Sequence, residues 1–204
     1  MIHAGGRGHD AVPVQPGRPP LLLASASPQR RAILQQVGIA FTVEPTSVEE
    51  ESRGEPRALV ALNARRKACA PRAPGRLVLG ADTVVSADGR PLGKPRDEQE
   101  AREHLALLGG VEHEVCGGIA LVRDGVLVDS AVVVTRVSFR PLTPELLDWY
   151  VRLGEWRERA GGYAIQGAGA ALVASIAGDY LNVVGLPLVR LLELAPELSP
   201  GVSD

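Results

Sequence analysis

The sequence predicts a mixed α/β fold, in which helices pack on a sheet that combines parallel and antiparallel strands. In the first part of the chain, short apolar runs alternate with helical patterns. Further on, the turn signals Asp88-Gly89 and Asp124-Gly125 stand between alternating apolar segments and predict hairpins. The order of elements is therefore not strictly strand–helix–strand, and the sheet should be mixed.

The first half begins with a short apolar run at 21–24, which predicts a buried strand. Ser27-Pro28 then predicts the start of a helix, because Ser is a favoured N-cap and Pro suits the first helical position. Gly38 closes that helix. The remaining elements expected here are a strand at 41–43, an acidic loop, a helix at about 55–70, and a strand at 77–81 with Asp82 at its C-terminal end.

The second half carries two more helix starts. Asp97 with Glu100 resembles a capping box and predicts a helix through Leu108. Thr143-Pro144 repeats the N-cap and proline signature and predicts a helix to Leu153. The other expected elements are a hairpin of 84–86 with 91–92, a hairpin of 114–123 with 126–138, strands at 170–177 and 180–184, and a helix from Pro187 to about Leu194.

The chain length of 204 residues suits one domain or two closely joined lobes. Residues 1–19 are rich in glycine and proline and have few apolar anchors, so we expect a disordered N-terminal tail. The folded domain should cover 20–197, and 198–204 should form a C-terminal tail.

Composition argues against several classes of partner. The net charge is −2, so a nucleic-acid polymer is not an expected ligand. No apolar run approaches the roughly 18–20 residues that span a bilayer, so no membrane is expected. Cys69 and Cys116 lack CxxC spacing and are interpreted as two buried, structural side chains, which fits a reducing cytoplasm. A polyanionic ligand would need a local cluster of basic groups.

The first candidate site lies where the strand at 21–24 meets the following helix. The free N–H groups and the positive end of the helix dipole favour an anion there. Ser25 and Ser27 supply hydroxyls, and Arg30 supplies a guanidinium that can bind phosphate oxygens. The alternative is an ordinary capped helix with solvated arginines.

The second candidate is Asp82, at the strand edge where open α/β sheets place ligands. The alternative is a turn aspartate that bonds its own backbone. Lys67 and Lys94 are the third candidate, and Asn63 shares a helix face with Lys67 because the two lie four positions apart. Ordinary surface lysines are the alternative there.

The fourth candidate is the glycine-rich stretch at 161–167. Its glycines suggest close approach of the backbone to a ligand. Gln166 lies within it and can read a base edge through its donor and its acceptor. The alternative is a flexible loop.

Together these segments resemble the Maf family, also called septum formation inhibitor-like proteins. The matching runs are LLLASASPQRRAILQQVGI at 21–39, LGADTVVSADGRPLGKPRD at 79–97, and AGGYAIQGAGA with GDYLNVVGLPL within 160–188. The resemblance implies a mixed α/β fold like that of inosine triphosphate pyrophosphatases, with a deep cleft. It implies hydrolysis of a nucleoside triphosphate between the α and β phosphates with a divalent metal, Mg²⁺ or Mn²⁺. A homodimer is a further expectation.

The resemblance also implies roles for individual positions. Asp82 matches the proton acceptor, and a metal-bound hydroxide is the alternative base. The catalytic set is Asp82, Lys67 and Lys94; the substrate-binding set is Ser25, Ser27, Gln29, Arg30, Thr83 and Gln166; the metal ligands are Glu50 and Asp82.

Base preference depends on Gln29, Thr83 and Gln166. The branch that acts on dTTP and UTP typically has Arg, Thr and Gln at these places, whereas the 7-methylguanosine triphosphate branch has Trp, Gln and Glu. The chain matches the pyrimidine branch at Thr83 and Gln166, and Gln29 departs from both. The alternatives are another base specificity and a non-catalytic nucleotide-binding regulator of cell division.

Overall fold

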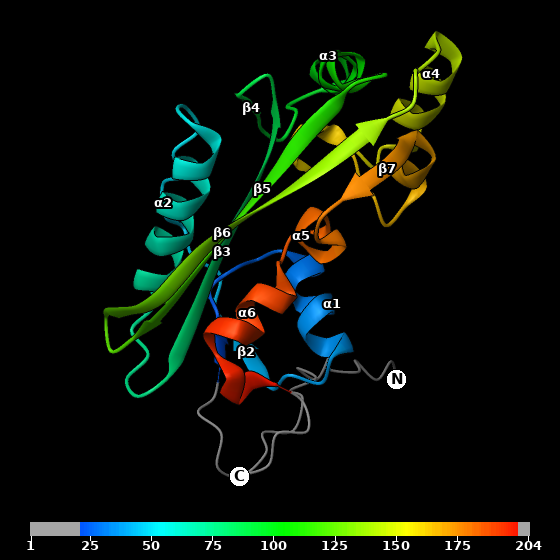
Figure 1. The fold of residues 1–204 in the computed structure, drawn as a ribbon. Helices are drawn as coiled ribbons and strands as arrows, with labels where there is room; N and C mark the ends of the chain where they lie inside the picture. Colours follow the sequence, from blue (N-terminus) through cyan, green and yellow to red (C-terminus); the bar gives the residue numbers. More distant parts are fainter. Residues whose placement is uncertain (1–20, 200–204) are drawn as a thin grey trace, which may run out of the picture.

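The computed structural model describes residues 21–199, which form a seven-stranded mixed sheet with flanking helices (Figure 1). The predicted fold class is therefore confirmed. The strands are β1 Leu21–Leu23, β2 Phe41–Val43, β3 Leu77–Ala87, β4 Arg90–Leu92, β5 Glu112–Arg123, β6 Val126–Phe139 and β7 Val173–Ala177. The α-helices are α1 Pro28–Gln36, α2 Pro56–Cys69, α3 Glu98–Leu108, α4 Pro144–Leu153, α5 Tyr180–Val184 and α6 Leu188–Leu194.

The sheet has the strand order β2-β1-β3-β5-β6-β7, with β4 paired to β3. β1 runs parallel to both β2 and β3, because helical crossovers connect these strands along the chain. The pairs β3–β5, β5–β6 and β6–β7 are antiparallel, and a turn at Asp124-Gly125 joins β5 to β6. The sheet is thus mixed, because the hairpins predicted from Asp88-Gly89 and Asp124-Gly125 add antiparallel strands to the parallel ones.

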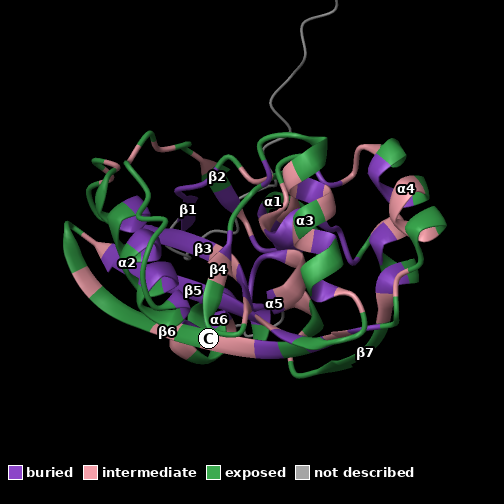
Figure 2. Cartoon of the chain, turned by 90° about the horizontal axis from the view of Figure 1, so that it is seen from above, coloured by how far each residue is buried: buried purple, intermediate pink, exposed green. Residues whose placement is uncertain are grey.

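The long strands β3, β5 and β6 pass through both ends of the molecule (Figure 1). At one end α1 and α6 pack on β1, β2 and the start of β3 around a first apolar core. At the other end α3 and α4 pack on the far parts of the same strands around a second core. Figure 2 shows the strands between the helices as mostly buried, whereas much of the outer strand β6 is exposed. A cleft can therefore open between the two cores.

Helix α2 covers the opposite face of the long strands, and two glycines let it approach closely. A Cβ atom at Gly80 would lie 2.1 Å from the Ala64 carbonyl oxygen. A Cβ atom at Gly118, the β5 partner of Asp82, would lie 2.3 Å from the Val60 carbonyl oxygen. Both distances are too short for any side chain. Glycine at these positions therefore fixes α2 against the part of β3 that carries Asp82.

Two expectations about local structure are wrong. Asp82 does not end a strand: β3 continues to Ala87, because Asp82 and the residues after it stay paired with β5. Residues 180–184 form helix α5, not a strand. Asp179 caps this helix by accepting hydrogen bonds from the backbone N–H groups of Leu181 and Asn182.

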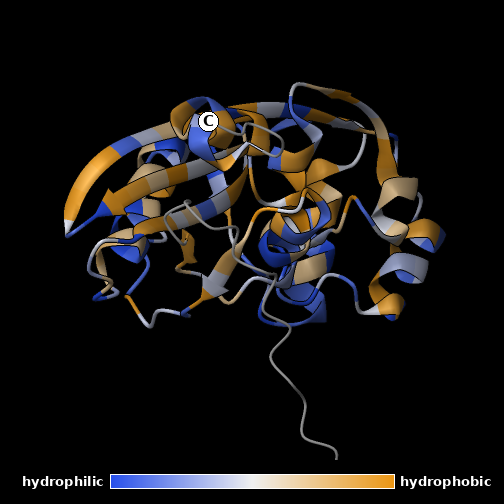
Figure 3. Cartoon of the chain, turned by 90° about the horizontal axis from the view of Figure 1, so that it is seen from below, coloured by the Kyte–Doolittle hydropathy of each residue, from blue (hydrophilic) through white to orange (hydrophobic). Residues whose placement is uncertain are grey.

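The predicted N-terminal tail, 1–19, and most of the predicted C-terminal tail lie outside the described residues. The described part ends in a short 3₁₀ helix, Pro196–Leu198, and Leu198 packs in the first core. Within 21–199 no helix is both long enough and apolar enough to cross a bilayer. Hydrophobic residues also reach the tip of the β5–β6 hairpin (Figure 3), where Val126 and Val128 are exposed.

Candidate active site

One cleft of about 630 Å³ lies between the two cores. Residues from α1, α2, β3, the segment after β4 and the loops at 157–160 and 163–166 line it. Every site residue named from the sequence contributes to this lining: Ser25, Ser27, Gln29, Arg30, Glu50, Lys67, Asp82, Thr83, Lys94 and Gln166. Segments far apart along the chain therefore meet around a single hollow.

The centre of the cleft holds a group that we name the carboxylate cluster: Asp82, Lys67, Glu50 and Asn63. The Lys67 ammonium lies 2.8 Å from Asp82 Oδ1 and 3.0 Å from Glu50 Oε1. Asn63 Nδ2 donates to Asp82 Oδ2 at 3.0 Å. Asp82 and Lys67 are 6% and 7% exposed, so this ion pair is largely shielded from water. Both oxygens of Asp82 are therefore held from the same face of α2.

Arg30 is the second buried cation of the cleft. Its Nε donates to the Gly185 carbonyl oxygen at 2.9 Å, and its terminal nitrogens donate to Ser25 Oγ and Thr83 Oγ1 at 2.9 and 3.1 Å. Burial lowers the pKa of Arg30, and the carboxylates of Asp82 and Glu50 oppose that shift. A guanidinium stays protonated under such conditions. Arg30 is thus a fixed positive charge beside the carboxylate cluster.

The start of α1 is capped as the sequence predicted. Ser27 Oγ accepts from the Arg30 backbone N–H at 3.4 Å, and Ser25 Oγ accepts from the Ser27 backbone N–H at 3.2 Å. Ser27 Oγ also donates to Gln29 Oε1 at 3.1 Å. The two serines therefore order the turn at the helix start, and they place Gln29 at the edge of the cleft.

Lys94 lies on the other side of the cleft, away from the buried cluster. Its ammonium is 2.8 Å from Glu158 Oε2, and both side chains are exposed. Lys94 is thus not shielded like Lys67, and its pairing with Glu158 is open to competition from a phosphate. The hydrogen bond from Lys94 lowers the pKa of Glu158.

Arg157 and Arg159 also line the cleft, and sequence reasoning missed them. The Nε atom of Arg159 is buried and has no hydrogen-bond partner among the described residues. Arg157 lies over the Trp156 ring, with 4.5 Å from its guanidinium carbon to the ring centroid. The available signal was their position directly before the glycine-rich stretch at 161–167.

Residues 163–169, here named the Gln166 loop, are held by hydrogen bonds from their backbone to the side chains of Tyr150 and Glu155. Tyr150 Oη accepts from the Ala164 backbone N–H at 3.0 Å. The Glu155 carboxylate accepts from the N–H groups of Ala168 and Gly169 at 3.0 and 3.3 Å. Gln166 itself is exposed at the cleft edge. The backbone is thus anchored on both sides of Gln166, which lines the cleft.

Tyr163 connects this loop to the second core. Its hydroxyl group shares a hydrogen bond of 2.9 Å with His113 Nε2, and both side chains are buried. Burial lowers the pKa of His113 from its ordinary 6.5 to about 4. It also raises the pKa of Tyr163. Both groups are therefore neutral at pH 7 and act as packing beneath the loop.

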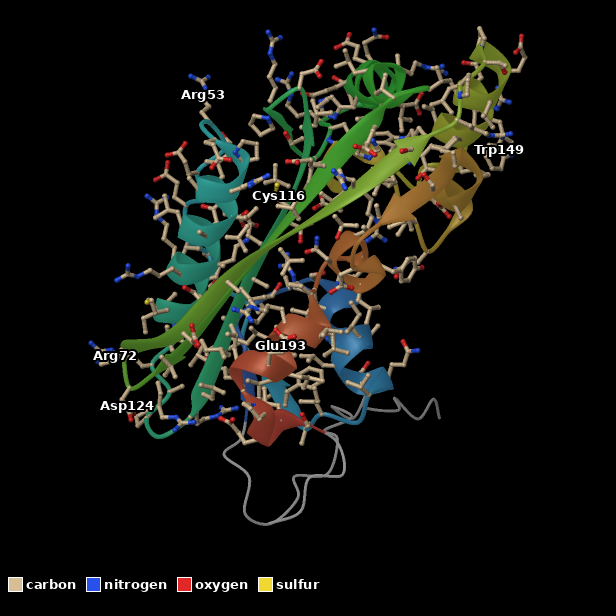
Figure 4. The ribbon with its side chains drawn as sticks, in the orientation of Figure 1. Arg53, Arg72, Cys116, Asp124, Trp149 and Glu193 are labelled. Atoms are coloured by element: carbon tan, nitrogen blue, oxygen red, sulfur yellow. The ribbon has the colours of Figure 1, made fainter. Side chains whose placement is uncertain are left out.

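The cysteines do not belong to the site. Cys116 is buried on β5 (Figure 4), and burial raises the pKa of its thiol to about 11. Cys69 is exposed, contrary to the expectation that both thiols are buried. It follows Ala68, which packs against Gly80, and adjacent helix positions point in different directions.

The carboxylates of the cleft are the side chains that could hold a divalent metal. Among residues 21–199 no group of three or more His, Cys, Asp or Glu side chains is arranged to hold an ion. Glu50 and Asp82 are nevertheless close together, since both contact the Lys67 ammonium. Mg²⁺ commonly uses one or two carboxylates together with substrate phosphates and water. These two carboxylates therefore fit a metal that is completed by a bound polyphosphate.

A shielded carboxylate among fixed cations, in one cleft of a mixed α/β sheet, defines the protein as an enzyme of phosphate chemistry. A family model described as Maf-like protein matches residues 20–198. The chain belongs to the Maf family.

Relatives cover most of the chain. A dTTP/UTP pyrophosphatase from Symbiobacterium thermophilum is 50% identical over 179 residues, which are 85% of this chain and 91% of that protein. One from Pyrococcus furiosus is 42% identical over 178 residues, 85% of this chain and 93% of that protein. A solved nucleoside-triphosphatase / dITP/XTP pyrophosphatase from Mycobacterium abscessus covers 66% of this chain and 94% of its own, with a TM-score of 0.37 and 19% identity.

Proposed function

We propose that this protein hydrolyses dTTP and UTP to the nucleoside monophosphate and pyrophosphate. The observation that carries the proposal is the shared cleft, in which Asp82 pairs with Lys67 and interacts electrostatically with the fixed charge of Arg30. The relatives named dTTP/UTP pyrophosphatases, with identities of 42 to 50%, support the reaction and its base preference. A homodimer and a cytoplasmic location stay predictions from the sequence.

The polyphosphate would bind along the cationic side of the cleft. A triphosphate concentrates several negative charges in a small volume, and Arg30, Lys67 and Lys94 would offset them. Arg30 is already fixed by Ser25, Thr83 and the Gly185 carbonyl oxygen, so its charge requires little reorganisation when substrate binds. Lys94 would exchange its exposed contact with Glu158 for a phosphate oxygen.

Asp82 would act on the attacking water. Its carboxylate is anchored through both oxygens and lines the cleft, so it can orient a water and accept its proton during attack at the α phosphorus. Glu50 and Asp82 would hold a divalent metal, Mg²⁺ or Mn²⁺, which when bound supplies charge neutralisation and a more acidic water. Pyrophosphate is then the leaving group.

Base recognition would come from the cleft edge. Thr83 lies beside Arg30, Gln29 follows the α1 cap, and Gln166 extends from its anchored loop. A Gln side chain offers both a donor and an acceptor, which matches the imide edge of uracil and thymine. A different base would cover these polar groups without pairing them, which would lower its binding strongly.

The test is a turnover assay of the full chain across nucleoside triphosphates, 7-methylguanosine triphosphate included, with Mg²⁺ and Mn²⁺ in turn. Chromatography should identify monophosphate and pyrophosphate, and kcat/KM should be highest for dTTP and UTP. Nucleoside diphosphate and inorganic phosphate as products would contradict the proposal. Tight nucleotide binding without turnover would favour a non-catalytic regulator, and a preference for 7-methylguanosine triphosphate would overturn the base assignment.

A further inference from the structure

The acidic segment that carries Glu50 has no regular secondary structure of its own. Residues 44–53 belong to no helix or strand, and Glu50 is exposed. Side chains of α2 hold this segment: Arg66 donates to the Glu49 carbonyl oxygen at 3.2 Å, and Lys67 pairs with Glu50 at 3.0 Å. The position of Glu50 relative to Asp82 therefore depends on α2.

Asn63 makes the most complete of these attachments. Its Oδ1 accepts from the Glu51 backbone N–H at 2.8 Å, and its Nδ2 donates to the Glu51 carbonyl oxygen at 2.9 Å. The same Nδ2 also donates to Asp82 Oδ2 at 3.0 Å. Asn63 is 1% exposed, and both polar atoms of its side chain are used. A single buried amide thus joins the acidic segment to the Asp82 carboxylate.

The geometry of α2 explains why Asn63 can join the acidic segment to Asp82. Asn63 and Lys67 lie four residues apart and share one face of the helix, where they take the two different oxygens of Asp82. Gly80, two residues before Asp82, lets the α2 backbone approach β3 closely at Ala64. The helix, the strand and the acidic segment are therefore fixed to one another at this point.

We propose that Asn63 is the positioning residue of the site, which orients the Asp82 carboxylate and keeps Glu50 beside it. This inference rests on the proposed function, because it assigns Asn63 to the hydrolysis that Asp82 supports. Asn63 does not touch the reacting atoms; it acts through the two carboxylates. A hydrogen-bonded partner of a functional carboxylate typically changes activity about 10–100-fold when it is removed.

The main variant is Asn63→Leu, which keeps the number and branching of side-chain heavy atoms and removes all three hydrogen bonds. We expect kcat to fall about 10–100-fold and KM to change by less than about threefold. The rate is counted per binding-competent site, by calorimetric titration with a non-hydrolysable α,β-methylene dTTP, so that a loss of folded protein does not mimic the effect. Hydrogen exchange at the Glu51 amide should also become faster, since its acceptor is gone.

Two further variants separate the two tasks of Asn63. Asn63→Asp keeps an acceptor for the Glu51 N–H and replaces the donor to Asp82 with a carboxylate oxygen that repels it, so kcat should fall while the Glu51 amide stays protected. Arg66→Leu is the matched control: it removes one exposed hydrogen bond to Glu49 and leaves both Asn63 bonds to Glu51 and the bond to Asp82 in place, so kcat should stay within about threefold of the parent.

The proposal is overturned if Asn63→Leu keeps kcat within about twofold, or if Arg66→Leu causes an equal loss. If Asn63→Leu does not fold, the same measurements on Asn63→Asp test the proposal. An unchanged kcat in that variant overturns the claim that Asn63 orients the Asp82 carboxylate. Failure of the proposed function looks different, because the parent enzyme itself would then turn over none of the triphosphates. If the parent enzyme shows no turnover, hydrogen exchange at the Glu51 amide still tests whether Asn63 holds the acidic segment.

Discussion

The two sides of the cleft differ in how firmly they are built. Three members of the carboxylate cluster, Asp82, Lys67 and Asn63, lie on a central strand and a helix and are at most 7% exposed. The opposite side, with Lys94, Glu158 and Gln166, consists of connecting segments whose side chains are exposed. The first side is arranged before any ligand binds, whereas the second must adjust to one. Under the proposed function, the chemical step would therefore depend on a prebuilt part of the cleft, whereas the contacts of Lys94 and Gln166 would depend on adjustable segments.

The largest expected effect comes from breaking the buried ion pair. Lys67→Met leaves Asp82 and Glu50 without their shared cation, so kcat/KM should fall by about 10³-fold and the free energy of unfolding by about 3 kcal/mol. Steady-state kinetics and urea denaturation measure the two losses. Arg66→Met, on the exposed neighbour, should change stability by about 0.5 kcal/mol or less. Equal effects of the two variants would contradict the prebuilt cluster.

The next largest effect is a pH dependence of the free energy of unfolding, caused by His113, which packs with Tyr163 of the Gln166 loop. His113 has a folded-state pKa of about 4, against 6.5 when it is exposed, because burial disfavours its charged form. Between these values the unfolded chain binds the extra proton, so stability is full above pH 6.5 and falls as the pH drops towards 4. The loss should reach roughly 3 kcal/mol. Chemical denaturation across this range should show a shallower slope for His113→Gln, and parallel curves would refute the assignment.

A smaller effect should come from the anchor of the Gln166 loop. In Glu155→Gln one oxygen becomes an amide group that cannot accept from Ala168 or Gly169, and the loop loses part of its support. The kcat/KM preference for dTTP over the next-best base should shrink by about tenfold, with kcat for dTTP changing little. Competition assays with paired triphosphates measure the ratio. An unchanged ratio would mean that this loop does not read the base.

The smallest effect is expected at the exposed pair. Glu158→Gln is the matched control for Glu155→Gln, because it makes the same change a few residues further along the same connecting segment. It removes the charge that competes for Lys94, so KM for dTTP should fall by about threefold or less at low salt, and the base ranking should stay the same. Raising the salt concentration should remove the difference. A larger KM would show that Glu158 contributes to substrate binding.

Local signals in the sequence predicted most elements because the cause of each element is itself local. The caps at Ser27 and Thr143 and the turn at Asp124-Gly125 are read from a few neighbouring residues, and the structure shows them as predicted. The prediction for residues 180–184 was wrong because their apolar and β-branched composition favours a strand. Asp179 caps their helix, and Asn182 attaches it to β5 by donating to the Val115 carbonyl oxygen.

The candidate site also could be predicted only as far as its causes are local in the sequence. Its residue types could be named from the sequence, but their contacts could not. Asp82 looked like the end of a strand because a charged residue follows an apolar run. In the fold it lies mid-strand, where Lys67 and Asn63 provide partners from α2. Such partners are set by how α2 packs on Gly80, which is a property of the whole fold.

The central claim is that Asp82 serves the chemical step while the cationic groups around it bind the polyphosphate. It is tested most directly by measuring, on Asp82→Asn, both the single-turnover rate with dTTP and the Kd of the α,β-methylene analogue with Mg²⁺. The account predicts that the rate falls by about 10²–10⁴-fold while Kd stays within about tenfold of the parent value. A rate close to that of the parent enzyme would contradict it.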